Sequence, residues 1–280
     1  MRVGFVGTEN SHVKHFIRFL NVERRHPGFQ AVVLAGGESE HNRSLAEFGG
    51  ISQIVKEPAD LLGHVDIAVV CNRDGAQHLA AAEPLLRAGV PVLVDKPLAA
   101  STTDAQALLQ AARDGGTRLF SASALRFVPE MEQFLADKEE HGPIRHLHVV
   151  GPADPDSEYS GLSFYGIHHV EAACQLLGNP VTSSDEIAWI ATRHGGSVTA
   201  LCRLADVNLH LTFMRPGEGY RVPFHATAVF DSAVTSRDLT LGPDYNAPAL
   251  DGFLHERWNL TEDQLLTPVA LMEALMKEIA

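Results

Sequence analysis

Cysteine is scarce in this chain, and the few cysteines do not cluster. The sequence of 280 residues contains three of them, Cys71, Cys174 and Cys202, at long intervals. An odd number of widely spaced cysteines argues against both a disulfide framework and a metal site built from thiolates. We therefore expect the three to be small, buried apolar residues.

Long apolar runs are also missing. No run approaches the roughly 20 residues that a helix needs to span a bilayer. The first residues, MRVGFVG, enter a strand pattern directly, without a charged, cleavable leader. We therefore expect a cytoplasmic protein that has no membrane partner.

The chain also has fewer basic than acidic residues. Lys and Arg number 22 against 35 Asp and Glu, which gives a net charge of −13. Such a charge opposes the approach of phosphate backbones, so we expect no nucleic-acid partner. It does not exclude a phosphate-bearing cofactor, because local backbone dipoles can hold a phosphate in an acidic protein.

The first part of the chain alternates apolar runs with stretches of helical periodicity. The apolar runs cover residues 2–7, 29–35, 51–55, 67–70, 90–94 and 118–120. Between the first two runs, Val13, Phe16, Ile17 and Leu20 recur at helical spacing. Strands that alternate with helices predict an α/β domain with a doubly wound parallel sheet over residues 1–123.

The pattern changes after about Ser123. Helices are expected near residues 129–137 and 167–177, and an apolar stripe predicts another near 265–276. Runs typical of strands cover 144–150, 186–192, 197–204, 207–213, 226–230 and 233–241. Consecutive strands with short polar turns predict an α+β domain with an open, mostly antiparallel sheet over residues 124–280. The cleft between the two domains is the default place for a site.

The turn after the first strand reads Gly7-Thr8-Glu9-Asn10-Ser11-His12. A dinucleotide fingerprint places three glycines in such a turn, for the tight bend, for the approach of the pyrophosphate and for helix packing. Only Gly7 is present, while Glu9 and His12 occupy the other two positions. A carboxylate at a helix N-terminus is stabilised by the helix dipole, so Glu9 is also a candidate to fill the anion site itself.

The end of the second strand is the place for an acidic residue that binds the adenosine ribose. Gly36 stands there, and Glu38 follows two residues later as a possible substitute. The residues that we expect to contact a cofactor in these two turns are Gly7, Thr8, Asn10, Ser11, His12 and Gly36.

Residues 65–99 read as strand, helix and strand, and they end on Asp95-Lys96-Pro97. Lys96 is thereby placed at the carboxyl edge of a parallel sheet, where ligands of open α/β sheets bind. A surface lysine at a strand end is the alternative reading.

Three local motifs make the chain resemble the Gfo/Idh/MocA oxidoreductase family over most of its length. Asp95-Lys96-Pro97 is similar to the family's Glu-Lys-Pro, Arg126-Phe127-Val128-Pro129 to the segment that enters its second domain, and Gly166-Ile167-His168 to the end of its Asp-x-x-x-His motif. The resemblance implies an N-terminal Rossmann domain that binds NAD or NADP and a C-terminal α+β domain. It also implies that Asn72 and Arg73 border a cofactor ribose.

The chain departs from the family pattern at Phe164, which stands where the family's aspartate is usual. One member of the expected lysine, aspartate and histidine set is therefore missing. The chain is also shorter than many members of the family, which suggests trimmed loops in its second domain.

Hydride transfer from a secondary alcohol needs a group that takes the hydroxyl proton and a cation that stabilises the developing alkoxide. We expect Lys96 and His168 to fill these roles, with Tyr165 as a further proton donor. Arg126 and His169 are the candidates for substrate binding. Alternatively, Arg126 pairs with an acidic neighbour, and the two histidines are a hydrogen-bonded pair without a reaction to run.

The chain contains 15 histidines, and His146 and His148 alternate so that both face one side of a strand. Asp154, Asp156, His168 and His169 are the candidates to lie near them in space. Since no HExxH motif or tight carboxylate set accompanies them, we predict no metal site. An exposed face of the second sheet predicts a homodimer or homotetramer.

These observations together predict an NAD(P)-dependent oxidoreductase that acts on a small polyhydroxylated or carbonyl substrate, such as a sugar or an inositol. Two alternatives remain open. In the first, a protein of this type has lost redox chemistry and uses Lys96 and His168 as a lyase, isomerase or hydrolase. In the second, the protein binds a metabolite without turning it over.

Overall fold

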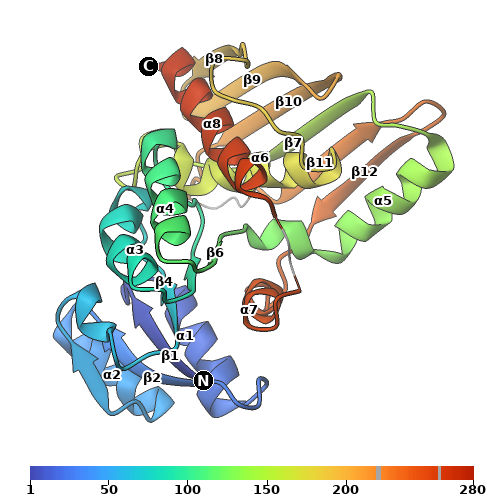
Figure 1. The fold of residues 1–280 in the computed structure, drawn as a ribbon. Coiled ribbons are helices and arrows are strands. Elements are labelled where there is room, and N and C mark those ends of the chain that lie inside the picture. The colour runs from blue at the N-terminus through green and yellow to red at the C-terminus, as the bar shows by residue number, and fades with distance from the viewer. Residues whose placement is uncertain (219–221, 258–259) are drawn as a thin grey trace. The chain divides into compact units, whose positions relative to one another are not determined.

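A computed structural model describes residues 1–218, 222–257 and 260–280, and the chain divides into two compact units (Figure 1). The first unit comprises Met1–Ala122 and Asn246–Leu260, and the second comprises Ser123–Tyr245 and Thr261–Ala280. The sequence suggested one boundary after residue 123. In the structure the chain also returns to the first unit before its final helix.

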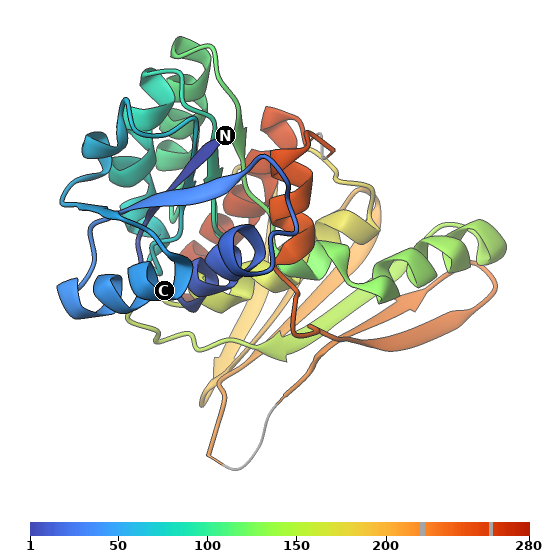
Figure 2. The same cartoon turned by 90° about the horizontal axis from the view of Figure 1, so that it is seen from below.

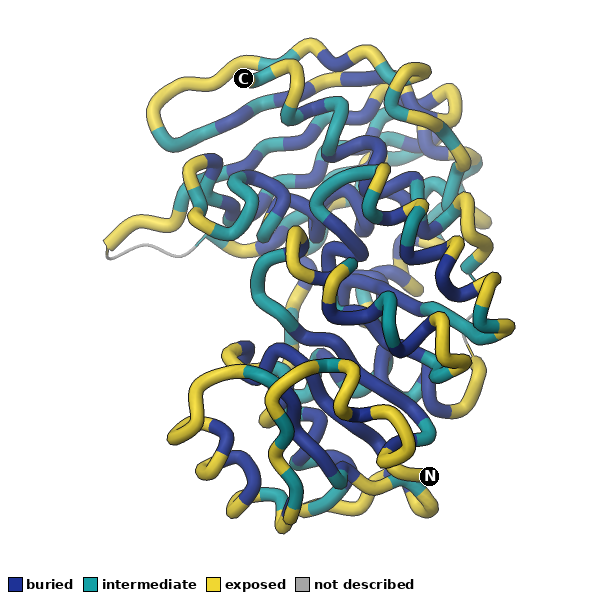
Figure 3. Tube along the Cα trace, turned by 60° about the vertical axis from the view of Figure 1, so that its left-hand side comes forward, coloured by how far each residue is buried: buried dark blue, intermediate teal, exposed yellow. Residues whose placement is uncertain are grey.

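The first unit is built on a sheet of six parallel strands, which confirms the predicted doubly wound fold. In spatial order the strands are β3 (Gln53–Val55), β2 (Gln30–Ala35), β1 (Arg2–Val6), β4 (Ile67–Val70), β5 (Val92–Val94) and β6 (Leu119–Phe120). Every residue of β4 and β5 is buried, as expected for a parallel sheet with both faces covered (Figure 3).

The helices of the first unit fall into two groups. Helices α1 and α2 contact each other, and α3 packs on α4. The two groups follow from the strand order, which runs from β1 to β3 on one side and from β4 to β6 on the other. Right-handed crossovers in these two directions place their helices on opposite faces of the sheet. The bounds are α1 (Ser11–Ile17), the π-helix η1 (Arg18–Val22), α2 (Ser39–Gly49), η2 (Pro58–Leu61), η3 (Gly75–Gln77), α3 (His78–Arg87), α4 (Thr102–Asp114) and α7 (Ala247–Leu254).

The second unit is built on a mixed, mostly antiparallel sheet, also as predicted. In spatial order its strands are β12 (Val234–Leu239), β11 (Phe224–Val229), β7 (His146–Pro152), β10 (Val207–Met214), β9 (Ser197–Leu204) and β8 (Ile190–His194). Only β7 and β10 run parallel. Buried and accessible residues alternate along β7, β9, β10 and β11, so one face of the sheet carries the core.

Helices cover the buried face of the second sheet. Helix α6 contacts β7 and β10, α5 contacts β12, and α8 contacts β8 (Figure 2). The bounds are η4 (Ala124–Phe127), α5 (Pro129–His141), α6 (Ser163–Leu176) and α8 (Glu262–Ile279). No helix in the described part of the chain has the length and hydropathy to cross a membrane.

Candidate functional site

The turn after β1 begins with Gly7, whose φ is +76°. A Cβ on this residue would lie 2.2 Å from the backbone nitrogen of Asn72, which follows the neighbouring strand β4. A positive φ and this close approach both require glycine. Gly7 therefore lets the turns after β1 and β4 lie against each other at the carboxyl edge of the sheet.

Glu9 contacts the turn after β4. Its Oε1 accepts a hydrogen bond from the Arg73 backbone N–H at 2.9 Å, and the Arg73 guanidinium donates to the Glu9 carbonyl oxygen at 3.0 Å. The cap of α1 is made by Asn10 instead, whose side chain accepts from the His12 N–H at 3.1 Å. The alternative that Glu9 fills the anion site of this helix is therefore wrong, because its carboxylate is bound to Arg73.

His12 and Asn10 both bind Asp95, the residue that follows β5. The distances to Asp95 Oδ2 are 2.7 Å from His12 Nδ1 and 3.0 Å from Asn10 Nδ2. Burial of the Asp95 carboxyl favours its neutral form, but the nearby His12 and Lys96 outweigh that effect and hold its pKa below the usual range. Asp95 is therefore an anion that joins the turn after β1 to the end of β5.

Lys96 is buried, with an exposed fraction of 5%. His78, which is also buried, braces the segments on either side of this position. Its Nδ1 lies 2.8 Å from the carbonyl oxygen of Pro97, and its Nε2 lies 2.9 Å from that of Asn72. Lys96 thus lies two residues after the end of β5 and is buried, so the reading as a surface lysine is wrong.

Among the described residues, the buried oxygens Thr8 Oγ1 and Asn72 Oδ1 at this edge have no hydrogen-bond partner, and neither has Asn42 Oδ1 beside Gly37. An unsatisfied buried polar atom costs about 1–3 kcal/mol, which a ligand that donates a hydrogen bond can recover. The hydroxyls of a dinucleotide's riboses are such donors, so the residues present fit this kind of cofactor. The predicted cofactor residues lie in the segments that follow β1, β2, β4 and β5, with Ser11 and His12 in the first turn of α1: Gly7, Thr8, Asn10, Ser11, His12, Gly36, Asn72, Arg73 and Lys96.

In the second unit, His168 lies on α6 and its exposed fraction is 6%. Its Nδ1 lies 2.6 Å from Ser123 Oγ. The same hydroxyl accepts from the Leu125 N–H at 3.1 Å, as the cap of η4. A hydroxyl can donate to or accept from an imidazole nitrogen, so Ser123 is compatible with either neutral tautomer of His168.

Arg126 forms a buried ion pair with Glu171, with 2.6 Å between Nε and Oε2. The other end of the guanidinium donates to Asn179 Oδ1 at 2.6 Å and to Gln175 Oε1 at 3.2 Å. Glu171 also accepts from the Ser123 N–H at 2.7 Å. The structure thus shows Arg126 paired with an acidic residue, which was the alternative to substrate binding. We therefore no longer assign Arg126 to substrate binding.

His169 is fully buried, and its ring packs 4.6 Å from that of Phe213 and 5.3 Å from that of Phe224. Burial lowers the pKa of His169 to about 4, although backbone groups of Gly151 and Tyr165 oppose part of the shift. It is therefore a neutral core residue, so we no longer assign it to substrate binding either.

Tyr165 is the accessible aromatic residue of this region, with an exposed fraction of 41%. Its ring lies 5.4 Å from that of His168, and His168 in turn lies 5.5 Å from Phe224. Tyr165 lines a cavity of about 320 Å³ with Pro152, Val222, Pro223, Phe224, Asp238, Leu239, Thr240 and Leu241. A tyrosine hydroxyl at a cavity wall can donate or accept a hydrogen bond to a ligand.

Phe164, at the position of the missing aspartate, packs against Tyr159 and Tyr165, with ring separations of 5.0 and 5.2 Å. The partner of His168 is instead Ser123, which lies 45 residues earlier in the chain. Sequence reasoning missed Ser123 and Glu171. The one available signal was that Ser123 immediately precedes the Ala124–Phe127 turn, where a serine is a preferred cap.

The histidines and aspartates weighed as a metal site do not converge. His148 stacks on His210 at 4.1 Å, while Asp154 pairs with Arg215 at 2.7 Å and Asp156 pairs with Arg193. A different set of possible ligands does converge, namely His26, Asp251 and His255.

Residues 1–123 match the family model described as "Oxidoreductase family, NAD-binding Rossmann fold", GFO_IDH_MocA. The chain is 29% identical over 225 residues to Inositol 2-dehydrogenase 1 of Saccharopolyspora erythraea. This match covers 75% of the chain but only 62% of that relative.

Two solved structures have the same fold. The structure of GenD2 from gentamicin A biosynthesis in complex with NAD is 19% identical, with a TM-score of 0.82 over 99% of this chain and 93% of that one. A putative myo-inositol dehydrogenase from Sinorhizobium meliloti 1021 is 15% identical, with a TM-score of 0.81 over 100% and 97%. At these identities the likeness shows the fold alone.

Proposed function

We propose that the protein is an NAD(P)-dependent oxidoreductase of the Gfo/Idh/MocA family, whose model its first 123 residues match. Its proposed substrate is a small polyhydroxylated or carbonyl compound. The observation that carries the proposal is the buried Lys96 at the carboxyl edge of a sheet whose turns fit a dinucleotide. When bound, the nicotinamide ring of the cofactor takes up or delivers the hydride.

Lys96 supplies positive charge for the substrate oxygen. Asp95 is already bound by His12 and Asn10, and the segment around Lys96 is braced by His78. A cation whose position is fixed in advance stabilises a developing alkoxide more than a mobile one does. Lys96 is accordingly the residue that orients the substrate oxygen and lowers the energy of its anionic form.

His168 takes the hydroxyl proton in the oxidative direction and returns it in the reductive direction. Ser123 Oγ is in contact with its Nδ1, so the opposite ring nitrogen is the one that exchanges the proton. When that nitrogen takes up a proton, Nδ1–H donates to Ser123. In this contact a neutral hydroxyl stands where the family pattern suggests an aspartate.

A polyhydroxylated substrate agrees with the polar groups around the cavity beside Tyr165. Tyr165, Asp238 and Thr240 offer hydrogen-bonding side chains, while Phe224 and Leu239 provide an apolar wall. Sites that bind small molecules combine these two kinds of surface. The inositol dehydrogenase relative places polyols first among the compounds to test.

NAD is the proposed form of the cofactor. Glu38 precedes α2 with no side-chain capping bond, and Glu40 lies in the first turn of that helix. Both carboxylates are exposed and follow directly from Gly36 at the end of β2. A negative charge at this position suits a ribose hydroxyl and repels the additional phosphate of NADP.

The first test is a thermal-shift titration of the purified chain with NADH and with NADPH. A nucleotide at a hundredfold excess over its dissociation constant stabilises the folded state by about 2.7 kcal/mol. We expect this with NADH, and weaker binding of NADPH that Glu38→Gln improves. No shift with either nucleotide would favour the non-redox alternatives over this proposal.

The second test is turnover on a panel of inositols and sugars, followed by the absorbance of the reduced nicotinamide. We expect Lys96→Met and His168→Asn each to lower kcat by about 10²–10⁴. The matched controls are Lys277→Met and His194→Asn, which change exposed residues. Binding of NADH without turnover on any polyol would favour a metabolite-binding protein, and full activity of both variants would refute the assigned roles.

A further inference from the structure

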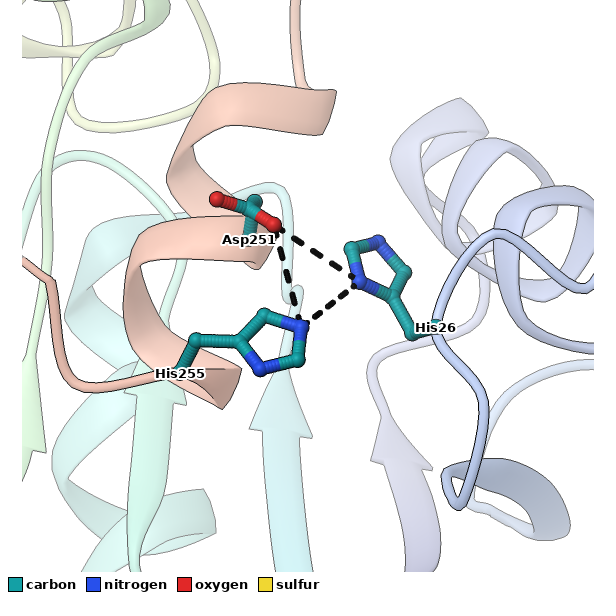
Figure 4. A group of neighbouring side chains, drawn as sticks. All are labelled: His26, Asp251 and His255. Atoms are coloured by element: carbon teal, nitrogen blue, oxygen red, sulfur yellow. Dashed lines mark hydrogen bonds and ion pairs between the residues drawn. The ribbon is translucent and has the colours of Figure 1, made fainter.

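Three possible metal ligands from distant parts of the chain meet within the first unit (Figure 4). His26 lies in the loop between η1 and β2, while Asp251 and His255 come from α7 and the residue after it. His26 Nδ1 lies 3.2 Å from His255 Nε2. Asp251 Oδ1 lies 3.8 Å from each of these two nitrogens.

His26 and His255 are hydrogen-bonded to each other, but their distances to Asp251 match a shared metal ion better than direct hydrogen bonds. At 3.8 Å, Asp251 Oδ1 is beyond hydrogen-bond range of both imidazoles. The nearest point equidistant from the three atoms lies in their plane, about 2.1 Å from each, which is the bond length from zinc to histidine nitrogen and carboxylate oxygen. A shift of the ion out of this plane toward a water molecule lengthens these distances only slightly. The three side chains therefore already lie around the position of an ion.

We propose that His26, Asp251 and His255 bind one Zn²⁺ ion, with a water molecule as the fourth ligand. Two imidazoles and one carboxylate are a donor set that zinc accepts. A metal ion needs a lone pair on both His26 Nδ1 and His255 Nε2. In the metal-free protein one of these two nitrogens carries the proton of the hydrogen bond between them. On metal binding that proton moves to the other nitrogen of the same ring. The net charge of the neutral histidine pair is unchanged by that shift.

The surroundings support this assignment. Arg257 Nη1 donates to Asp251 Oδ2 at 2.9 Å, which leaves Oδ1 turned toward the histidines. Such outer contacts orient the ligands of metal sites. The Phe29 ring meets that of His255 at 5.5 Å, edge to face.

The site has a route to solvent. His26 has an exposed fraction of 5%, against 35% for Asp251 and 32% for His255. His26 also lines an open cavity of about 420 Å³ with Arg24, Phe29 and Gln30 among its neighbours. An ion and its water can therefore reach the two accessible ligands first, as a binding site requires.

The role of the ion follows from its place in the fold. His26 precedes β2, so the cluster lies at the amino end of the parallel strands, opposite the edge that carries Lys96. An ion bound there would therefore act on the stability of the first unit and not on the chemistry proposed at Lys96. It joins the returning segment Asn246–Leu260 to the rest of the first unit, where Phe253 already stacks on Phe120 and Glu256 pairs with Arg118.

The test uses the full chain without a histidine tag, stripped with a chelator and then titrated with Zn²⁺ alone. We expect one high-affinity site per chain, a higher Tm with zinc, and a loss of affinity of at least about tenfold in His255→Gln and in Asp251→Asn. Co²⁺ in place of Zn²⁺ should give the strong visible absorption of a tetrahedral site.

The matched control is His148→Gln, which removes an imidazole from the His148–His210 pair and leaves the proposed ligands in place. Circular dichroism of the stripped variants checks that each is folded. Zinc binding that survives in both His255→Gln and Asp251→Asn, or that is lost in His148→Gln instead, would overturn the proposal. So would the absence of a high-affinity site in the unmodified chain.

Discussion

Ser123 Oγ and His168 Nδ1 lie 2.6 Å apart, although 45 residues separate them in the chain. This contact gives the proposed catalytic histidine a hydroxyl partner in place of a carboxylate. A hydroxyl stabilises an adjacent imidazolium less than an anion does, because it carries no net charge. The orientation of the His168 ring therefore depends in part on a neutral contact that a single substitution can remove.

Replacing Ser123 by alanine should lower kcat by about tenfold to a hundredfold through misorientation of His168, with little change in KM. The same change removes the cap of η4 and should cost about 1 kcal/mol of stability. The pH dependence of kcat separates the two effects, because only loss of the His168 contact moves it. Ser123→Thr keeps the hydroxyl and should restore most of the activity; a normal pH profile in Ser123→Ala would contradict the positioning role.

Replacing only one residue of the Arg126–Glu171 ion pair should strongly destabilise the protein. Arg126→Met or Glu171→Gln alone leaves the other partner's charge or hydrogen-bonding groups buried, and we expect each to destabilise the second unit by about 3–5 kcal/mol. The double variant should cost clearly less than the sum of the two. Urea unfolding of the single and double variants measures this coupling, and additive costs would show that the pair is not a unit.

Acid should destabilise the protein between about pH 6.5 and pH 4 because of His169. Its pKa is about 4 in the folded chain and 6.5 in the unfolded one. The unfolded state therefore binds more protons in this window, and stability falls as the pH falls, by about 3 kcal/mol in total. His169→Gln should flatten this part of the stability curve.

Burial and neighbouring histidines also lower the pKa of His148 to about 4. Because this side chain is half-exposed, we expect its protonation to reduce the stability of the protein less than that of His169 does. The carboxyls with lowered pKa values, such as Asp95, lose their contribution only at lower pH. An unchanged slope between pH 6.5 and pH 4 in His169→Gln would contradict the assignment to that residue.

Gly7→Ala should lower the stability of the protein more than Gly63→Ala does, although the two glycines have similar φ angles. Gly63 has a φ of +80°, close to the +76° of Gly7, but a Cβ at Gly63 meets nothing within 4 Å. Gly63→Ala should therefore cost only the strain of about 1–2 kcal/mol. Gly7→Ala adds a clash with the backbone of Asn72 and should cost about 1–3 kcal/mol more. Equal Tm values for the two variants would show that the turn can open.

The sequence by itself determined the two sheets and the placement of Lys96. Strand and helix periods are local properties, so apolar runs of three to nine residues and the glycine after β1 were enough to predict them. One helix, α7 (Ala247–Leu254), was not predicted, because a short segment that is apolar on most sides carries no clear period.

Only the tertiary structure decided which side chains meet. His12 and Asp95 are 83 residues apart, Arg126 and Glu171 are 45 apart, and His26 and His255 are 229 apart. A contact between distant residues depends on strand order and on the direction of each side chain, and neither leaves a mark in the local sequence. The structure therefore assigned Arg126 and His169 to the interior, gave His168 its serine, and brought His26 to α7.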